Sequence, residues 1–259
     1  MPKVILEAHD AVAALRLNNG VINAIGSELL DDLSDALKRI KTEFKGMVLA
    51  GGEKFFCIGL DLPGLLQLGR AEMVTFYFNF MQVVLDLYTL PMPTACALNG
   101  HATAGGAIFA LSSDFRFASA GRKLIGLNEV KIGLPVPYLT DLILRQVVGD
   151  RCATEMMFKG EFVEPEKAQE IGLVDAVFSP EDLEEKAVAK IAELAALPSQ
   201  GLTLIKNNRV EAVRSQYEGV RSTEADLFLD CWFNPAVQEQ LREAAKKFEH
   251  KVARVTKVI

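Results

Sequence analysis

The sequence predicts an α/β fold in which a mostly parallel sheet is joined to a layer of helices. Before Pro137, short apolar runs alternate with longer segments of helical periodicity, a pattern typical of parallel strands connected by crossover helices. From Pro137 onward, apolar residues recur at helical spacing between proline and glycine breaks. Half of the 259 residues are hydrophobic, which is enough for a well-buried core.

A hairpin and an amphipathic helix are expected first. Residues 4–6 and 12–17 have the composition of strands, with a polar turn at His9 and Asp10 between them. Residues 27–41 are predicted to form a helix, because acidic side chains come early and basic ones late, which suits the helix dipole. The apolar face of this helix would consist of Leu29, Leu30, Leu33, Leu37 and Ile40.

Strands and helices then alternate as far as Pro137. The predicted strands are residues 46–50, 94–98 and 114–118, and the predicted helices are residues 73–90 and 105–112. The helices expected after Pro137 are residues 138–148, 151–158, 165–172, 180–196 and 235–247. We expect these later helices to form a layer that takes part in an oligomer interface.

Composition and charge exclude several classes of protein. The net charge is -6 and Lys and Arg form no cluster, so a nucleic-acid partner is not expected. The four cysteines are scattered without a C-x-x-C pair, so neither a zinc site nor a disulfide framework is predicted. Residues 73–90 carry Asn79, Gln82 and Asp86 at helical spacing, so no membrane span is expected. The N-terminus lacks the apolar run of a signal peptide, which predicts a cytoplasmic protein.

Three clusters of residues have the composition of a reactive site. Residues 54–62 lead an apolar run into a glycine, where the backbone can approach a ligand closely. Residues 99–107 are nearly free of bulky side chains and lie between a strand and a helix, so their backbone amides would be unobstructed. Residues 125–137 place one carboxylate, Glu129, among apolar residues, where burial raises a carboxyl pKa toward a value suited to taking and giving a proton.

Each cluster also has an ordinary structural explanation. Asp61 fits the N-cap of a helix, and a lone Glu129 beside Lys131 fits a paired charge. A catalytic triad of His101 with the nearby serines is not expected, because no G-x-S-x-G turn presents a serine. We expect His101 to be satisfied by a local polar partner and Cys57 to be a small buried hydrophobe.

Taken together, the runs F-F-C-I-G-L-D-L, N-G-H-A-T-A-G-G and I-G-L-N-E resemble, in this order and at this spacing, the crotonase superfamily. This group is also called the enoyl-CoA hydratase/isomerase family, and the resemblance covers nearly the whole chain. It implies a crotonase-like spiral of ββα units with a C-terminal helical region that builds homotrimers, often paired as homohexamers. On this basis residues 1–195 are expected to form the spiral core and residues 196–259 the helical trimerisation region.

The resemblance also implies a set of site residues. The backbone amides of Ile58 and Gly105 would form an oxyanion hole, which stabilises the negative charge that develops on the thioester oxygen of an acyl-coenzyme A substrate. Glu129 would move the proton. The residues whose backbone would hold the coenzyme A moiety are Ala24, Cys57, Gly59 and Leu60.

Family hydratases use two glutamates to activate water, and this chain matches only the second, with Glu129. Ile108 stands at the position of the first and cannot orient water, so efficient hydration is not expected. A single carboxylate can still carry a proton from C2 to C4, and the I-G-L-N-E run is similar to that of Δ3-Δ2-enoyl-CoA isomerases. The resemblance therefore implies an isomerase of fatty acid β-oxidation that needs no metal or redox cofactor. Another crotonase reaction, such as hydration or thioester hydrolysis, and a catalytically silent acyl-CoA-binding subunit remain as alternatives, although the retained Glu129 favours catalysis.

Overall fold

The computed structural model describes residues 1–256 and gives side-chain positions for residues 1–247. Its main sheet has six strands in the order β1-β2-β3-β5-β7-β9, and every neighbouring pair is parallel except the hairpin β1-β2. The strands are β1 (Val4–His9), β2 (Val12–Leu17), β3 (Gly46–Ala50), β5 (Thr94–Leu98), β7 (Phe115–Ser119) and β9 (Ala176–Phe178). The predicted parallel sheet is confirmed, and β9 adds a strand in a region where the pattern predicts helices alone.

The opening hairpin differs from the prediction at its turn. His9 pairs with Val12 in the antiparallel register, so the turn consists of Asp10 and Ala11 rather than of His9 and Asp10. Asp10 has a φ of 52°, a left-handed conformation that Asp and Asn adopt more readily than most residues. His9 therefore belongs to the first strand, and the tight turn rests on Asp10.

A second, three-stranded parallel sheet brings the three residue clusters together. It consists of β4 (Phe55–Cys57), β6 (His101–Thr103) and β8 (Ile125–Gly126), in the order β4-β6-β8. Each strand comes from a different cluster, and strands of two or three residues are too short to show a period in the sequence. Because the strands are parallel, the loops that follow them meet at one edge of this sheet.

The helices expected from periodicity are confirmed, with ends that differ by a few residues and a last helix that extends further. Those helices are α1 (Ser27–Glu43), α3 (Arg70–Tyr88), α4 (Gly105–Leu111), α5 (Tyr138–Val148), α6 (Asp150–Lys159), α7 (Pro165–Glu170), α8 (Leu183–Ala195) and α11 (Pro235–Thr256). The sequence pattern did not predict α2 (Leu62–Leu65), the 3-10 helix η1 (Glu129–Ile132), α9 (Ser199–Glu218) and α10 (Arg221–Trp232).

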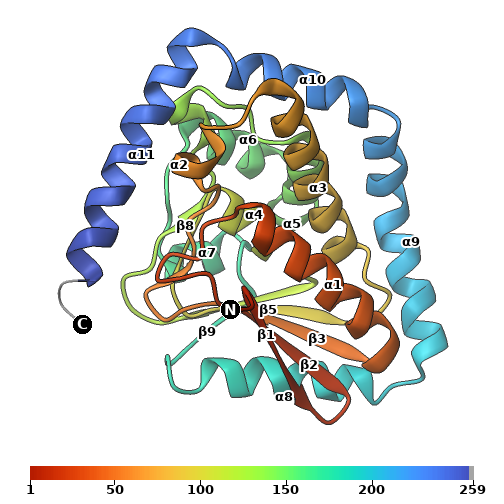
Figure 1. Ribbon diagram of the computed structural model, residues 1–259. Helices are drawn as coiled ribbons and strands as arrows, with labels where there is room; N and C mark the ends of the chain where they lie inside the picture. The colour runs from red at the N-terminus through yellow and green to blue at the C-terminus, as the bar shows by residue number, and fades with distance from the viewer. Residues whose placement is uncertain (257–259) are drawn as a thin grey trace.

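Alternate residues of the main sheet face two separate hydrophobic layers. Val48 and Ala50 pack against α8, where Ile191 is fully buried. Met47 and Leu49 point to the opposite layer, which contains the apolar faces of α1, α3 and α4. Both faces of the sheet are therefore buried, which is why its central strands are continuous apolar runs in the sequence. Figure 1 shows α8 on one side of the sheet, with α1 and α3 on the other.

The last three helices wrap around the outside of the core (Figure 1). Helix α9 is attached through Lys206, a buried lysine whose Nζ lies 2.6 Å from Asp114 Oδ2; burial lowers the pKa of this amine, and the carboxylate partly offsets the effect. Helix α10 packs against α3, and α11 packs against α2 and η1. Within residues 1–256 no helix has the length and apolar character needed to cross a membrane.

Candidate active site

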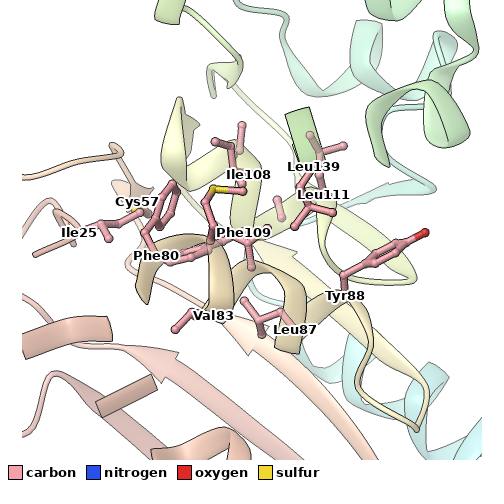
Figure 2. Close-up of a cluster of buried hydrophobic side chains, with 14 of the residues drawn as sticks. Ile25, Cys57, Phe80, Val83, Leu87, Tyr88, Ile108, Phe109, Leu111 and Leu139 are labelled. Carbon is pink, nitrogen blue, oxygen red and sulfur yellow. The ribbon is translucent and has the colours of Figure 1, made fainter. Parts of the chain in front are cut away.

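A cavity of about 520 Å³ lies beside the second sheet, where its loops meet α3, α10 and α11. Most of the side chains that line it are apolar. Lys54 and Phe162 are exposed and mark where the cavity opens to solvent. Phe80 and Ile108 lie deep in the wall and are each 2% exposed, and Figure 2 shows them within the buried cluster formed by α3 and α4.

Glu129 is the only carboxylate among the residues that line this cavity in the described part of the chain. It begins η1 and is 6% exposed. Burial raises the pKa of Glu129 to about 7, and the backbone N–H groups of Glu129 and Asn128 oppose the shift only in part. Its Oε2 atom has no hydrogen-bond partner among the described residues. The carboxyl is therefore poised between its two protonation states near neutral pH, with one oxygen available to a ligand.

Lys131 does not neutralise this carboxyl. The lysine is exposed on the outside of η1, whereas Glu129 is buried, and no ion pair joins them within residues 1–247. The alternative that Glu129 is an ordinary paired charge is therefore wrong.

The glycine-rich run turns sharply from β6 into α4. Ala104 has φ 49° and ψ -122°, a strained conformation for a residue with a Cβ, and its N–H is held by the carbonyl of Gly126 at 2.9 Å. Gly105 follows as the first helical residue, so its N–H has no acceptor within the helix. A Cβ on Gly105 would lie 2.8 Å from Ile25 Cδ1, and one on Gly106 would lie 2.0 Å from the carbonyl oxygen of Cys57. Close packing thus requires both glycines and leaves the Gly105 amide at the cavity wall.

The backbone of Gly59 and Leu60 faces this turn. Gly59 has a φ of 101°, and a Cβ there would lie 3.0 Å from the Gly105 nitrogen. Ile25 donates to the Gly59 carbonyl at 2.8 Å, and Asp61 donates to the Ile25 carbonyl at 2.9 Å. Successive amides of an extended chain point in alternating directions, so the N–H of Leu60 points away from Ile25. Within residues 1–256 this N–H has no hydrogen-bond partner, and Leu60 lines the cavity.

Ile58 also lines the cavity, but its backbone is already engaged. Its N–H donates to the carbonyl of Ile22 at 3.2 Å, and its carbonyl accepts from Thr103 Oγ1 at 3.0 Å. The predicted oxyanion role would require the Ile58 amide to give up its partner. The unpartnered amide beside Gly105 is instead that of Leu60, two residues later.

The other residues predicted to hold the substrate lie behind the cavity wall. Ala24 is buried, and its carbonyl accepts from Asn19 Nδ2 at 2.8 Å. Cys57 is fully buried, and burial raises the pKa of its thiol to about 12, which confirms its expected character as a small hydrophobe. Gly59 contacts the Gly105 turn without lining the cavity. Ala24 and Cys57 therefore support the backbone around the site rather than form its surface.

The remaining polar candidates have local explanations. Asp61 stands at the N-cap position of α2, but its side chain makes no capping hydrogen bond. His101 lines the cavity, and its Nδ1 accepts from the Leu124 N–H at 2.9 Å, which confirms the expected local partner. All four cysteines are free, and within the described residues no group of three or more His, Cys, Asp or Glu side chains is placed to hold a metal ion.

Two lining residues come from the C-terminal helices and were missed by sequence reasoning. Phe228 on α10 and Ala244 on α11 reach the cavity. In the sequence both belong to helical segments whose apolar residues are indistinguishable from ordinary core positions, so no local signal marks them. The C-terminal layer therefore completes the site as well as covering the core.

Comparison with known proteins agrees with this geometry. A family model described as enoyl-CoA hydratase/isomerase matches residues 7–253. Human mitochondrial enoyl-CoA delta isomerase 1 is 27% identical over 240 residues, which cover 91% of this chain and 80% of the human protein. A putative enoyl-CoA hydratase from Thermus thermophilus is 34% identical over 189 residues, covering 71% of this chain and 74% of that protein. The crystal structure of human mitochondrial delta3-delta2-enoyl-CoA isomerase superposes with a TM-score of 0.92 at 26% identity, covering 96% of this chain and 99% of the human chain. The chain therefore has the crotonase fold and belongs to the enoyl-CoA hydratase/isomerase family.

Proposed function

We propose that this protein is an isomerase that moves the double bond of a 3-enoyl-CoA to the 2-position. The observation that carries the proposal is the lone, buried Glu129 in an otherwise apolar cavity, with its pKa raised to about 7 and its Oε2 unpartnered among the described residues. A carboxyl that titrates near neutral pH suits a step in which the same group first accepts and then donates a proton. The human relatives named as enoyl-CoA delta isomerases give independent support.

In the proposed reaction, the Glu129 carboxylate removes a proton from C2 of the substrate. The C2–H electron pair forms a double bond between C1 and C2, and the carbonyl electrons move onto the thioester oxygen. The result is a dienolate with double bonds between C1 and C2 and between C3 and C4. Protonated Glu129 then returns the proton at C4, the electrons move back from the oxygen, and the double bond between C3 and C4 becomes one between C2 and C3. No atom is gained or lost, and the carboxylate is regenerated.

The dienolate oxygen needs hydrogen-bond donors that are already in place. We assign this role to the amides of Gly105 and Leu60, because both residues line the cavity and neither N–H has a partner among the described residues. Two such amides stabilise the developing charge at no cost of reorganisation during the reaction, and one donor is worth about a hundred- to a thousandfold in rate. A Cβ on Gly59 would lie 3.0 Å from the Gly105 nitrogen, and this close approach of the two backbone segments supports a common binding point for one oxygen atom.

The side chain of Ile108 disfavours hydration as the reaction of this site. Addition of water across a double bond calls for a group that orients and activates the water, whereas the side chain of Ile108 is apolar and 2% exposed. With a single carboxylate at the cavity, proton relocation within the substrate is the reaction the site favours. Hydration, thioester hydrolysis and silent acyl-CoA binding are the alternatives that product analysis with acyl-CoAs distinguishes.

The proposed reaction defines what the site must bind. We propose that the acyl group occupies the apolar cavity while the coenzyme A moiety passes the backbone of Leu60 toward the opening near Lys54, a cation suited to phosphate groups. Proton transfer alone changes no oxidation state, so we propose that neither a metal nor a redox cofactor takes part. The cytoplasmic location stays a prediction.

We also propose that the protein forms a homotrimer or a pair of trimers. Leu204 and Ile205 on α9 and Leu227 on α10 expose 56%, 64% and 62% of their surface. Exposed apolar side chains on two consecutive helices of the C-terminal layer favour contact with another copy of the chain. Association of two copies through this layer would also restrict the motion of α10, which contributes Phe228 to the cavity wall.

The proposal is tested by incubating purified protein with 3-enoyl-, 2-enoyl- and saturated acyl-CoAs and identifying the products by mass spectrometry and ultraviolet absorbance. Conversion of 3-enoyl-CoA to conjugated 2-enoyl-CoA is expected. Formation of 3-hydroxyacyl-CoA as the main product would identify a hydratase, release of free coenzyme A would identify a hydrolase, and binding without conversion would identify a silent subunit.

A further inference from the structure

Phe228 forms a buried part of the cavity wall. Its side chain lines the cavity and is 3% exposed. Behind it the ring stacks on Tyr77 at a centroid distance of 4.2 Å and on Trp232 at 6.2 Å. Tyr77 and Trp232 are at most 1% exposed, so the space behind Phe228 is filled core. An acyl chain that extends through the cavity as far as Phe228 therefore meets a packed wall.

The position of this wall is fixed by a carboxylate one helical turn earlier. Tyr77 donates from its hydroxyl to Glu224 Oε1 at 2.5 Å, and the Tyr138 N–H donates to the same oxygen at 3.3 Å. These bonds attach α10 to α3 and to the start of α5, and α10 lies next to α3 in Figure 1. Because Glu224 and Phe228 lie four residues apart on one helix, they share a face. The contacts of Glu224 therefore hold the Phe228 ring against the cavity.

We propose that Phe228 is a specificity-determining residue that sets the longest straight acyl chain the cavity accepts. The inference rests on the proposed function in so far as an acyl group is the ligand. Each methylene buried in apolar surroundings strengthens binding roughly fourfold. A chain that has reached Phe228 gains nothing from further methylenes, because the next one must displace a ring packed between Tyr77 and Trp232.

The experiment measures binding of saturated acyl-CoAs, from hexanoyl to hexadecanoyl, by isothermal titration calorimetry. For the unchanged protein, affinity should rise with each methylene up to a limiting chain length and then level off or fall. This limiting chain length is called the break. In Phe228→Ala the break should move to chains about two to four carbons longer, because the space of the lost ring admits that many methylene-sized groups. Phe228→Leu should move it in the same direction by less, and it serves in place of Ala where that variant fails to fold.

Leu229→Ala is the matched control. Leu229 neighbours Phe228 on α10 and is 1% exposed, but it does not line the cavity. Its truncation should lower the Tm, as a core deletion does, while leaving the break at the wild-type chain length. A break that stays in place in both Phe228 variants would overturn the inference, as would an equal shift in Leu229→Ala, since loosening of α10 would then explain the change.

Failure of the proposed function gives a different result. A protein that binds acyl-CoAs with a break moved by Phe228→Ala, yet converts no 3-enoyl-CoA, would refute the isomerase proposal and support this one. A protein that binds no acyl-CoA of any length would overturn both. Where turnover is present, kcat/KM for 3-enoyl-CoAs should follow the same break, and Phe228→Ala should change the ratio between the longest and the shortest substrate by tenfold or more.

Discussion

The substitution Glu129→Gln tests the assigned base through activity and stability at once. Gln fills the same volume, but its amide cannot accept the C2 proton. The value of kcat should therefore fall about a hundred- to ten-thousandfold while KM changes little. For the unchanged enzyme, kcat/KM should rise with pH through a value of about 7, because burial raises the Glu129 pKa to that point and only the carboxylate is a base.

The same pKa shift predicts how the stability of the fold depends on pH. The Glu129 pKa is raised from 4.5 to about 7 in the folded chain, so between these values the unfolded chain releases a proton that the folded chain keeps. The wild-type fold is therefore destabilised as pH rises through this window. Between pH 5 and pH 8 this lowers the free energy of unfolding by roughly 2 to 3 kcal/mol. Glu129→Gln has no such titration and should gain stability relative to wild type by this amount over the same interval.

Urea unfolding of both proteins at pH 5 and pH 8, together with a spectrophotometric isomerase assay, measures the two effects. Asp61→Asn is the control, because Asp61 is near the site in sequence but does not line the cavity. It should retain turnover. Wild-type turnover in Glu129→Gln would show that the base is elsewhere. A stability difference between the two proteins that is the same at both pH values would show that folding does not raise the Glu129 pKa.

Three further predictions concern the rest of the site and the assembly. Ile108→Glu should introduce slow hydration of 2-enoyl-CoA, detected as 3-hydroxyacyl-CoA, and should lower the Tm because a second carboxyl is buried. EDTA should leave isomerase turnover unchanged; a loss that zinc or magnesium reverses would contradict the metal-free mechanism. Multi-angle light scattering at micromolar concentration should give the mass of three or six chains, and a monomeric mass would refute the proposed trimer.

The sequence predicted the elements in which periodicity is strong. The helix with Leu29, Leu33 and Ile40 on one face begins at Ser27 as expected, and all three side chains are buried. Helix α9 was missed, because its few buried positions include Lys206 while Leu204 is exposed, so it lacks a clean apolar face. The strands β4, β6 and β8 were missed because two or three residues show no period.

The candidate site was only partly predictable for a similar reason. Glu129 stands out in sequence as a carboxylate among apolar residues, and its burial confirms that expectation. The amide of Ile58 is engaged and that of Leu60 is not, because the Ile58 N–H donates to the Ile22 carbonyl. This backbone hydrogen bond has no signature in the sequence. The same holds for Phe228, since packing in space alone brings a residue of α10 to the cavity.

The central claim is that one carboxyl both removes and returns the proton, and label transfer in a single turnover tests it most directly. A 3-enoyl-CoA carrying deuterium at C2 is mixed with excess enzyme in ordinary water, and the product is examined by NMR and mass spectrometry. Glu129 is 6% exposed, so its acquired deuteron is shielded from solvent and part of it should appear at C4 of the 2-enoyl-CoA. A product whose C4 hydrogen comes from solvent alone would contradict the account.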